Sequence, residues 1–392
     1  MKSKFIACSL AALAASSALA TADDLGMSRS KKLPVSNGSA GSFDAQFHDG
    51  NGLVWMNTDT GVVWDSASGG FAAFTLPFKV VKWNGQKFNA YNFTDMTVEP
   101  TVNLVIYGTN PAMFLSKQDI NFAGKFTIAA AAGAGGAAPD QNTPPYNGGT
   151  GASATNTAGG GGGSGPIGGV QGQCSPEVVT AGGGGGGGNA SRGQPGLPGD
   201  YPVDAGGTPQ NDPPGPGGLK MPVRKLVGGA GGGAGGGGFW SGDFYGQPGA
   251  NGGGAVIFSS SKGAITIASG AVIDASGADG AVSNGGSGSS GGGAGGDEWF
   301  YASGTFTNNG SLLMHGGAGG KSQYTSGCFN PVTVEGPDGG NGSGGQLEVH
   351  AATFDNAGLI DVSGGGHAKS YGGSVELIGD VTRRGRIEGL GN

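Results

Sequence analysis

Five segments of the chain repeat one pattern of apolar and polar positions. Each begins with an apolar residue, continues through three or four mostly polar residues and a glycine, and ends in a second short apolar alternation. Such short alternations, bounded by glycine, predict β-strands rather than helices. The segments cover residues 120–128, 265–274, 306–314, 354–362 and 381–388.

A further short apolar stretch precedes each repeat, at 103–107, 255–258, 298–301, 346–349 and 374–378. A unit of two or three short strands is too small to bury a face alone, but units stacked about 4.8 Å apart can pair their backbones and align similar side chains. The pattern predicts an all-β fold, a parallel β-helix or solenoid with its first coil at 101–130 and further coils at 255–392. A β-sandwich of ordinary hairpins is the alternative, and the similar order within each unit favours the solenoid.

Single glycines divide the two halves of the repeats. We expect Gly270, Gly310, Gly358 and Gly385 to be equivalent and to turn the chain with positive φ, which a side chain would resist. Their unequal spacing indicates a fixed core with loops of variable length.

The region 42–100 is predicted to form a small N-terminal β cap. Apolar stretches at 52–56 and 61–64 flank a Thr-Asp-Thr turn, and those at 79–83 and 87–91 flank Asn84-Gly85, a strong hairpin signal. A cap is needed because the open end of a coil exposes unpaired backbone. The polar residues 21–41 are expected to form a flexible leader.

The middle region, 131–254, contains 45 glycines in 124 residues, in runs separated by proline-rich loops. Glycine-rich chains often behave as flexible linkers. Alternatively, the runs can form a bundle of extended chains with three residues per turn, similar to polyproline II and here called polyglycine II-like, because strands without side chains can approach closely. We favour the ordered bundle, inserted between the first and second coils.

The N-terminus carries a secretory signal over residues 1–20. Two lysines precede a short apolar run, and Ala18-Leu19-Ala20 supplies small residues for cleavage after Ala20 or Ala22. No second segment has the length and apolarity of a transmembrane helix. We therefore expect a secreted or cell-surface protein, and the short signal is typical of bacteria.

Composition restricts the partners. Glycine accounts for 91 of 392 residues, only 12% are charged, and loss of Lys2 and Lys4 with the signal changes the formal charge from −7 to −9. A lysine-poor acidic chain is a poor ligand for polyanions, so nucleic acid is not an expected partner.

After signal removal two cysteines remain, Cys174 and Cys328, and export permits a disulfide between them. The chain lacks a CxxC motif and its four histidines are scattered, which argues against a zinc site. We predict no cofactor and no bound metal.

Three carboxylates fall at matching places in their repeats: Asp274, Asp361 and Glu388. A solvated outer face is the favoured interpretation of this acidic ladder, with calcium binding next. Paired carboxylates also occur in polysaccharide-cleaving enzymes, but a leucine or methionine at 313–314 interrupts the ladder. We predict no catalytic residues.

Aromatic residues beside the glycine runs are the candidate ligand contacts, because exposed rings stack on the apolar faces of sugars. The alternative is that these rings cover glycine-rich backbone or fill the core. The candidates are Trp240, Tyr245, Trp299, Tyr301 and Tyr324.

The segments 306–310, 354–361 and 383–388 resemble the repeats of filamentous-haemagglutinin-type adhesins, which implies a right-handed parallel β-helix on a bacterial surface. The resemblance covers about 140 residues, and the chain lacks the secretion domain of that family. The glycine runs are similar in composition to the polyglycine sandwiches of phage tail-tip adhesins.

Three classes of function follow from these features. The favoured one is a structural or adhesive protein of the bacterial envelope or extracellular matrix, which self-assembles because the last coil ends at 391–392 without a polar cap. The second is a module that binds carbohydrate, or ice, for which regular Thr-x-Thr ladders are missing. The third is a β-helix polysaccharide lyase or hydrolase.

Overall fold

The computed structural model describes residues 33–45, 52–65, 72–138, 151, 183–197, 216–217, 219–220, 225–236, 246–284, 288–326, 332–335, 338–367 and 371–390. These residues form an all-β protein, as predicted, with 3-10 conformation at the short turn η3 (Gly365–His367) and at Tyr371. The predicted signal segment, 1–20, lies outside the described residues.

Most of the strands belong to two large sheets. The 11-stranded sheet contains β1 (Phe43–Ala45), β5 (Phe78–Trp83), β6 (Gln86–Phe93), β7 (Met96–Val98), β9 (Ala112–Ser116), β10 (Ile120–Phe122), β12 (Ala255–Ser260), β13 (Ile265–Ile267), β16 (Asp297–Asn308), β20 (Gln346–Asn356) and β22 (Ser374–Arg383). The nine-stranded sheet contains β2 (Leu53–Asn57), β3 (Val62–Asp65), β4 (Ala72–Thr75), β8 (Asn103–Gly108), β11 (Lys125–Ala130), β14 (Val272–Asp274), β17 (Ser311–Leu313), β21 (Leu359–Asp361) and β23 (Arg386–Glu388). A separate three-stranded sheet contains β15 (Ser283–Asn284), β18 (Ser322–Ser326) and β19 (Val332–Glu335).

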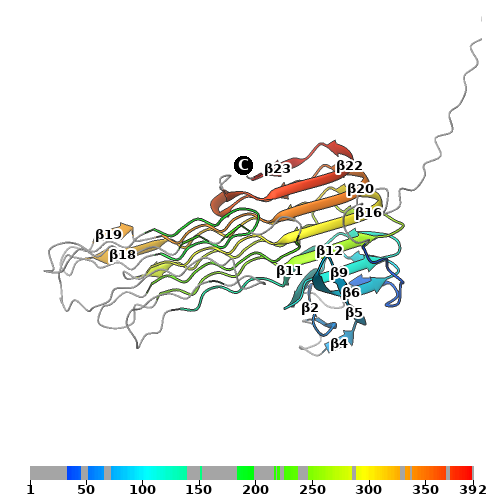
Figure 1. Cartoon of the computed structure of the whole chain (residues 1–392), viewed down its shortest axis with the longest axis horizontal. Coiled ribbons are helices and arrows are strands. Elements are labelled where there is room, and N and C mark those ends of the chain that lie inside the picture. The colour runs from blue at the N-terminus through cyan, green and yellow to red at the C-terminus, as the bar shows by residue number, and fades with distance from the viewer. Residues whose placement is uncertain are drawn as a thin grey trace, which may run out of the picture.

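Successive passes of the chain run through the two large sheets in the same order. β9, β10 and β11 are followed by β12, β13 and β14, and each strand pairs in parallel with its counterpart one pass later. In the later passes one long strand, β16, β20 or β22, takes the places of the first two. This mostly parallel, repeated pairing is compatible with the predicted β-helix, and the passes form a stack from β5 to β22 (Figure 1).

The core lies between the two large sheets, and equivalent side chains stack in columns through it. Tyr91, Phe114, Phe258 and Phe300 occupy one column with ring centroids 5.5, 5.5 and 5.3 Å apart, and each ring is fully buried. Stacked rings contribute about 0.5–1.5 kcal/mol per pair beyond the burial of their area. Parallel register therefore turns a repeated aromatic position into a continuous stabilising column.

The inter-strand glycines differ from the prediction. The register aligns Ala271, not Gly270, with Gly124, Gly310, Gly358 and Gly385. Within the predicted set only Gly270 has positive φ, +84°. The other positions require glycine for space, because a Cβ on Gly358 would lie 2.1 Å from the backbone oxygen of Gly310 in the pass below.

Antiparallel hairpins close the N-terminal end of the stack. β5 and β6 are joined by Asn84 and Gly85, both with positive φ (46° and 82°), which confirms the predicted hairpin. β2 and β3 form the second predicted hairpin, and β4 continues it. Other strands of the predicted cap, β6 among them, pair in parallel with the next pass.

The described part of the predicted leader packs on this end rather than standing free. Leu33 is buried beside Trp83, and the Ala40 amide donates a hydrogen bond to the Asn92 carbonyl, 2.8 Å away.

Extended glycine-rich chains lie side by side next to the sheets and form what we call the glycine bundle: residues 133–136, 183–188, 228–236, 247–254, 275–280, 288–296, 314–320 and 338–345. Their amides bond to neighbouring chains at intervals of three residues. Gly133 and Gly136 donate to the carbonyls of Gly229 and Gly232, both at 2.9 Å. This three-residue period is the one expected of chains in a polyproline II-like conformation.

The glycine bundle is also larger than the predicted insertion at 131–254. The chains at 275–280, 288–296, 314–320 and 338–345 connect later passes of the sheets and hydrogen-bond into the same bundle. Each of these passes therefore leaves the sheets, enters the bundle and returns. In Figure 1 the bundle extends to the left of the sheets, with β18 and β19 at its far end.

Candidate functional site

Two of the predicted ligand contacts are buried, on the outer face of the 11-stranded sheet. Trp299 and Tyr301 on β16 expose only 3% and 5% of their surface, because Trp83 from β5 and Leu226 pack over this face. The ring of Trp83 meets those of Trp299 and Tyr301 edge-on, with centroids 5.9 and 6.4 Å away. These two rings are therefore core residues, in agreement with the alternative considered for them.

The other three candidates are not placed on a surface. Trp240 and Tyr245 lie outside the described residues. Tyr324 lies in β18, where its backbone pairs with that of Val334 in β19.

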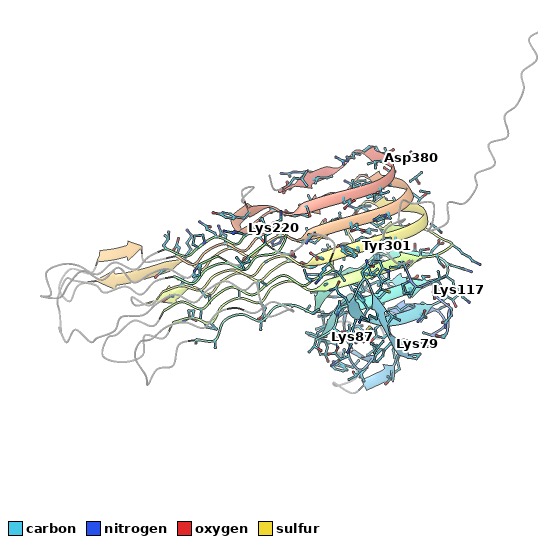
Figure 2. The ribbon with its side chains drawn as sticks, in the orientation of Figure 1. Lys79, Lys87, Lys117, Lys220, Tyr301 and Asp380 are labelled. Carbon is cyan, nitrogen blue, oxygen red and sulfur yellow. The ribbon has the colours of Figure 1, made fainter. Side chains whose placement is uncertain are left out.

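A small polar network surrounds Tyr301, which Figure 2 shows near the middle of the stack. Glu348 on β20 accepts hydrogen bonds from the Tyr301 hydroxyl (2.8 Å) and from Nε2 of His350 (2.6 Å). The His350 ring stacks on Tyr301 with centroids 4.8 Å apart. Burial, with the nearby Glu348 carboxylate, raises the pKa of Tyr301 well above its usual value. The protonated Tyr301 hydroxyl on β16 donates to Glu348 on β20, and the buried His350 ring packs on Tyr301. The network therefore links the two strands through side chains.

Asp297 joins the glycine bundle to the sheets. One carboxylate oxygen accepts a hydrogen bond from the Val227 amide at 2.8 Å, and the other accepts one from Asn189 Nδ2 at 2.9 Å. Asn189 also donates to the Gly295 carbonyl at 2.7 Å. Complete burial raises the pKa of Asp297 to about 7 in spite of these hydrogen bonds, which oppose the shift. The Asp297 side chain thus holds two segments that lie 70 and 108 residues away along the chain.

Glu298 points the opposite way, into the core. It is fully buried, and neither carboxyl oxygen has a hydrogen-bond partner among the described residues. Its neighbours in register are Val256 on β12 and Leu347 on β20. Burial, with a smaller contribution from the Asp274 charge, raises the pKa of Glu298 well above its usual value. A carboxyl group in such surroundings is held neutral.

The predicted acidic ladder lies on the outer face of the nine-stranded sheet. Asp274, Leu313, Asp361 and Glu388 are paired in register, so Leu313 separates Asp274 from the other two. Asp361 is 3% exposed and accepts a hydrogen bond from the Ser363 amide at 2.9 Å, and Asp274 pairs with Lys125 at 3.4 Å. Glu388 forms an ion pair with Arg386. These contacts give the carboxylates structural roles.

A different aromatic cluster is accessible. Trp55 and Trp64 are a cross-strand pair on β2 and β3, and both meet Tyr107 on β8 edge-on, with centroids 6.1 and 5.7 Å apart. All three rings are partly exposed on the outer face of the nine-stranded sheet. Beside them Asp59 accepts hydrogen bonds from the backbone and side chains of Thr109 and Asn110, which lower its pKa against the effect of burial. Alternation in the hairpin 52–64 was the sequence signal for this cluster.

The remaining predictions concern cysteines and metal ions. Cys174 and Cys328 both lie outside the described residues, so their pairing stays a prediction. Among the side chains that the structure places, no three histidine, cysteine or acidic residues are grouped closely enough to hold a metal ion.

The described strands and turns include no helix with the length and apolarity that a membrane crossing requires. Comparisons with models of protein families, with curated proteins and with solved structures gave no match to this chain.

Proposed function

We propose that this chain is a secreted or surface-exposed structural and adhesive protein of the bacterial envelope or extracellular matrix, built as a parallel β-solenoid that carries a polyglycine II-like bundle. The proposal rests on one observation: the same passes of the chain build both the sheets and the glycine bundle. Each pass from β12 to β20 alternates between the large sheets and the bundle, and Asp297 joins them through Val227 and Asn189.

This construction suits a structural role. Backbone hydrogen bonds hold the bundle chains at close spacing, and the apolar columns hold the strands, so no pass can unfold without disrupting both systems. The outer face of the nine-stranded sheet, with the partly exposed Trp55, Trp64 and Tyr107, remains available for contacts, and self-assembly through the ends of the stack would lengthen the structure.

Immunogold labelling of intact cells of the source organism, with mass spectrometry of the mature N-terminus, tests the proposal. We expect label on the outer surface or in the surrounding matrix, and a protein that begins at Thr21 or Asp23. A full-length protein retained in the cytoplasm would refute it. Loss of cell-to-surface attachment in a deletion strain would support the adhesive part.

A second candidate function, carbohydrate binding, is favoured by the cluster of Trp55, Trp64 and Tyr107. Partly exposed rings next to hydrogen-bonding side chains combine apolar contact area with polar edges. An acidic protein is expected to prefer neutral glycans over anionic ones.

Replacing Trp64 by alanine is expected to weaken binding to a neutral polysaccharide at least tenfold, because tryptophan is enriched among binding hot spots, whose truncation costs about 2 kcal/mol or more. Affinity electrophoresis through gels containing neutral glucans or chitin derivatives measures the effect. Replacement of Phe74, an exposed ring on the neighbouring strand β4, is the matched control. Equal mobility of the unmodified protein in gels with and without each polysaccharide would count against this function.

A further inference from the structure

The 11-stranded sheet has an unpaired edge at each end of the stack. β22 pairs with β20 on one side, and β5 pairs with β6 on one side; no described strand pairs with either outer edge. Exposed edges of this kind are templates for pairing with another chain. Figure 2 shows Lys79 and Lys87 at the β5 end and Asp380 at the β22 end.

The register through the sheet places opposite charges at equivalent positions on the two edges. One continuous column of paired residues begins at Lys79 on β5 and ends at Glu376 on β22. Between them lie Ala90, Met113, Ile257, Trp299 and Glu348. Lys79 and Glu376 are both exposed. If a second copy continued the stack, the two charges would lie directly opposite each other.

The neighbouring columns end in apolar residues at both edges. Val80 shares a column with Val375, and Phe78 shares one with Leu377. Val80 is 63% exposed on its edge. Val375 and Leu377 are only partly buried, whereas Leu347 and Val349, one pass earlier, expose 1% and 0%. Both edges therefore leave apolar side chains uncovered at matching places.

The strand directions are compatible with this pairing. β6 runs parallel to the passes above it and β5 runs antiparallel to β6, so β5 of a second copy would meet β22 as an antiparallel neighbour. In an antiparallel pair of strands, directly opposite side chains lie close together. Opposite charges at such positions therefore stabilise the pairing.

We propose that copies of this chain associate head to tail, with β22 of one copy pairing with β5 of the next and Glu376 lying opposite Lys79. Val375 then meets Val80, and Leu377 meets Phe78. The two surfaces differ, so the contact is heterologous and produces open chains of molecules rather than a closed dimer. This contact rests on the proposed structural function and specifies which strands meet when copies assemble.

The pairing is confined to the 11-stranded sheet. The nine-stranded sheet carries two further strands, β3 and β4, beyond β2 at the N-terminal end. Two strands lie beyond β2 there, whereas only β5 lies beyond β6, so the terminal edges of the two sheets are not level and β23 takes no part in the proposed pairing.

Charge reversal with rescue tests the register. We expect the purified full-length protein to form species that grow with concentration in sedimentation velocity. Glu376→Lys and Lys79→Glu should each weaken association about tenfold, since a favourable cross-strand pair becomes an unfavourable one. The double variant should restore association to within about threefold of the unmodified protein.

Lys262→Glu is the matched control, because Lys262 is an exposed lysine in the middle of the stack, and it should leave association unchanged. Unchanged circular dichroism would show that each variant is folded. Monomers at all concentrations, a closed dimer, or a double variant that fails to recover would each overturn the inference. A monomeric protein that is nevertheless labelled on the cell surface would refute this assembly alone, whereas an assembling protein retained in the cytoplasm would refute the proposed function.

Discussion

Replacing Glu298 by methionine is expected to stabilise the protein at neutral pH. The carboxyl group is fully buried between Val256 and Leu347, and neither oxygen has a partner among the described residues. An unsatisfied buried polar group costs about 1–3 kcal/mol, which an apolar side chain of similar volume removes. Unfolding in guanidinium chloride at pH 7 measures the effect. The midpoint of the transition should rise, while its dependence on denaturant concentration stays unchanged.

The same substitution should change the pH dependence of stability. The folded state holds the Glu298 proton more tightly than the unfolded state does, because burial raises its pKa. Its contribution is therefore most favourable below the ordinary pKa of glutamate and declines as the pH rises above that value. The advantage of the methionine variant should grow with increasing pH and shrink toward pH 4.

Glu99→Met supplies the control, because Glu99 is a partly exposed glutamate outside the core and outside the proposed assembly contact. It should change the midpoint little and leave the pH profile intact. A lower midpoint for Glu298→Met at pH 7 would show that the buried carboxyl group contributes contacts that the packing does not reveal.

Replacing Gly293 by alanine is expected to disrupt the glycine bundle. A Cβ at this position would lie 1.9 Å from the backbone oxygen of Asn251 and 2.5 Å from its carbonyl carbon. Backbone cannot yield as a flexible side chain can, so the expected cost is at least about 3 kcal/mol, the upper part of the range for overpacked cores. Hydrogen exchange of residues 288–296 and their neighbours measures the effect.

Gly270→Ala is the control for Gly293→Ala, because it tests the cost of positive φ without steric contact from a neighbouring chain. Gly270 has φ of +84° and nothing within 4 Å of an added Cβ. Alanine there should cost only about 1–2 kcal/mol, the penalty for a left-handed conformation. We expect faster amide hydrogen exchange only in residues near Gly270. If Gly293→Ala had no larger effect than this control, the close packing of the bundle chains would be contradicted.

The strands themselves were predictable from the sequence. The alternating segments at 120–128 and 265–274 became β10, β11, β13 and β14, and Asn84-Gly85 formed its hairpin. These features depend on local properties: period-two apolarity, and the tolerance of asparagine and glycine for positive φ. Local properties are present in the sequence before any packing occurs.

The candidate aromatic residues were less predictable. Trp299 and Tyr301 lie on an outer face of a sheet, where exposure is the ordinary outcome, but Trp83 and Leu226 cover them. Trp55, Trp64 and Tyr107 have a similar composition and remain partly exposed. Which outer face is covered depends on segments more than 70 residues away, and no local pattern carries that information.

The sequence by itself determined the all-β class, the positions of the repeated strands and the abundance of glycine, because each follows from local side-chain chemistry. Only the tertiary structure decided why most of the glycines are required. The contacts of Gly310, Gly358, Gly385 and Gly293 show that close approach between backbones, rather than positive φ, is what a side chain would meet at these positions. Ala271 occupies the equivalent place in its own pass, so the restriction depends on the local spacing between chains. Distances between chains remote in sequence arise only when those chains pack together.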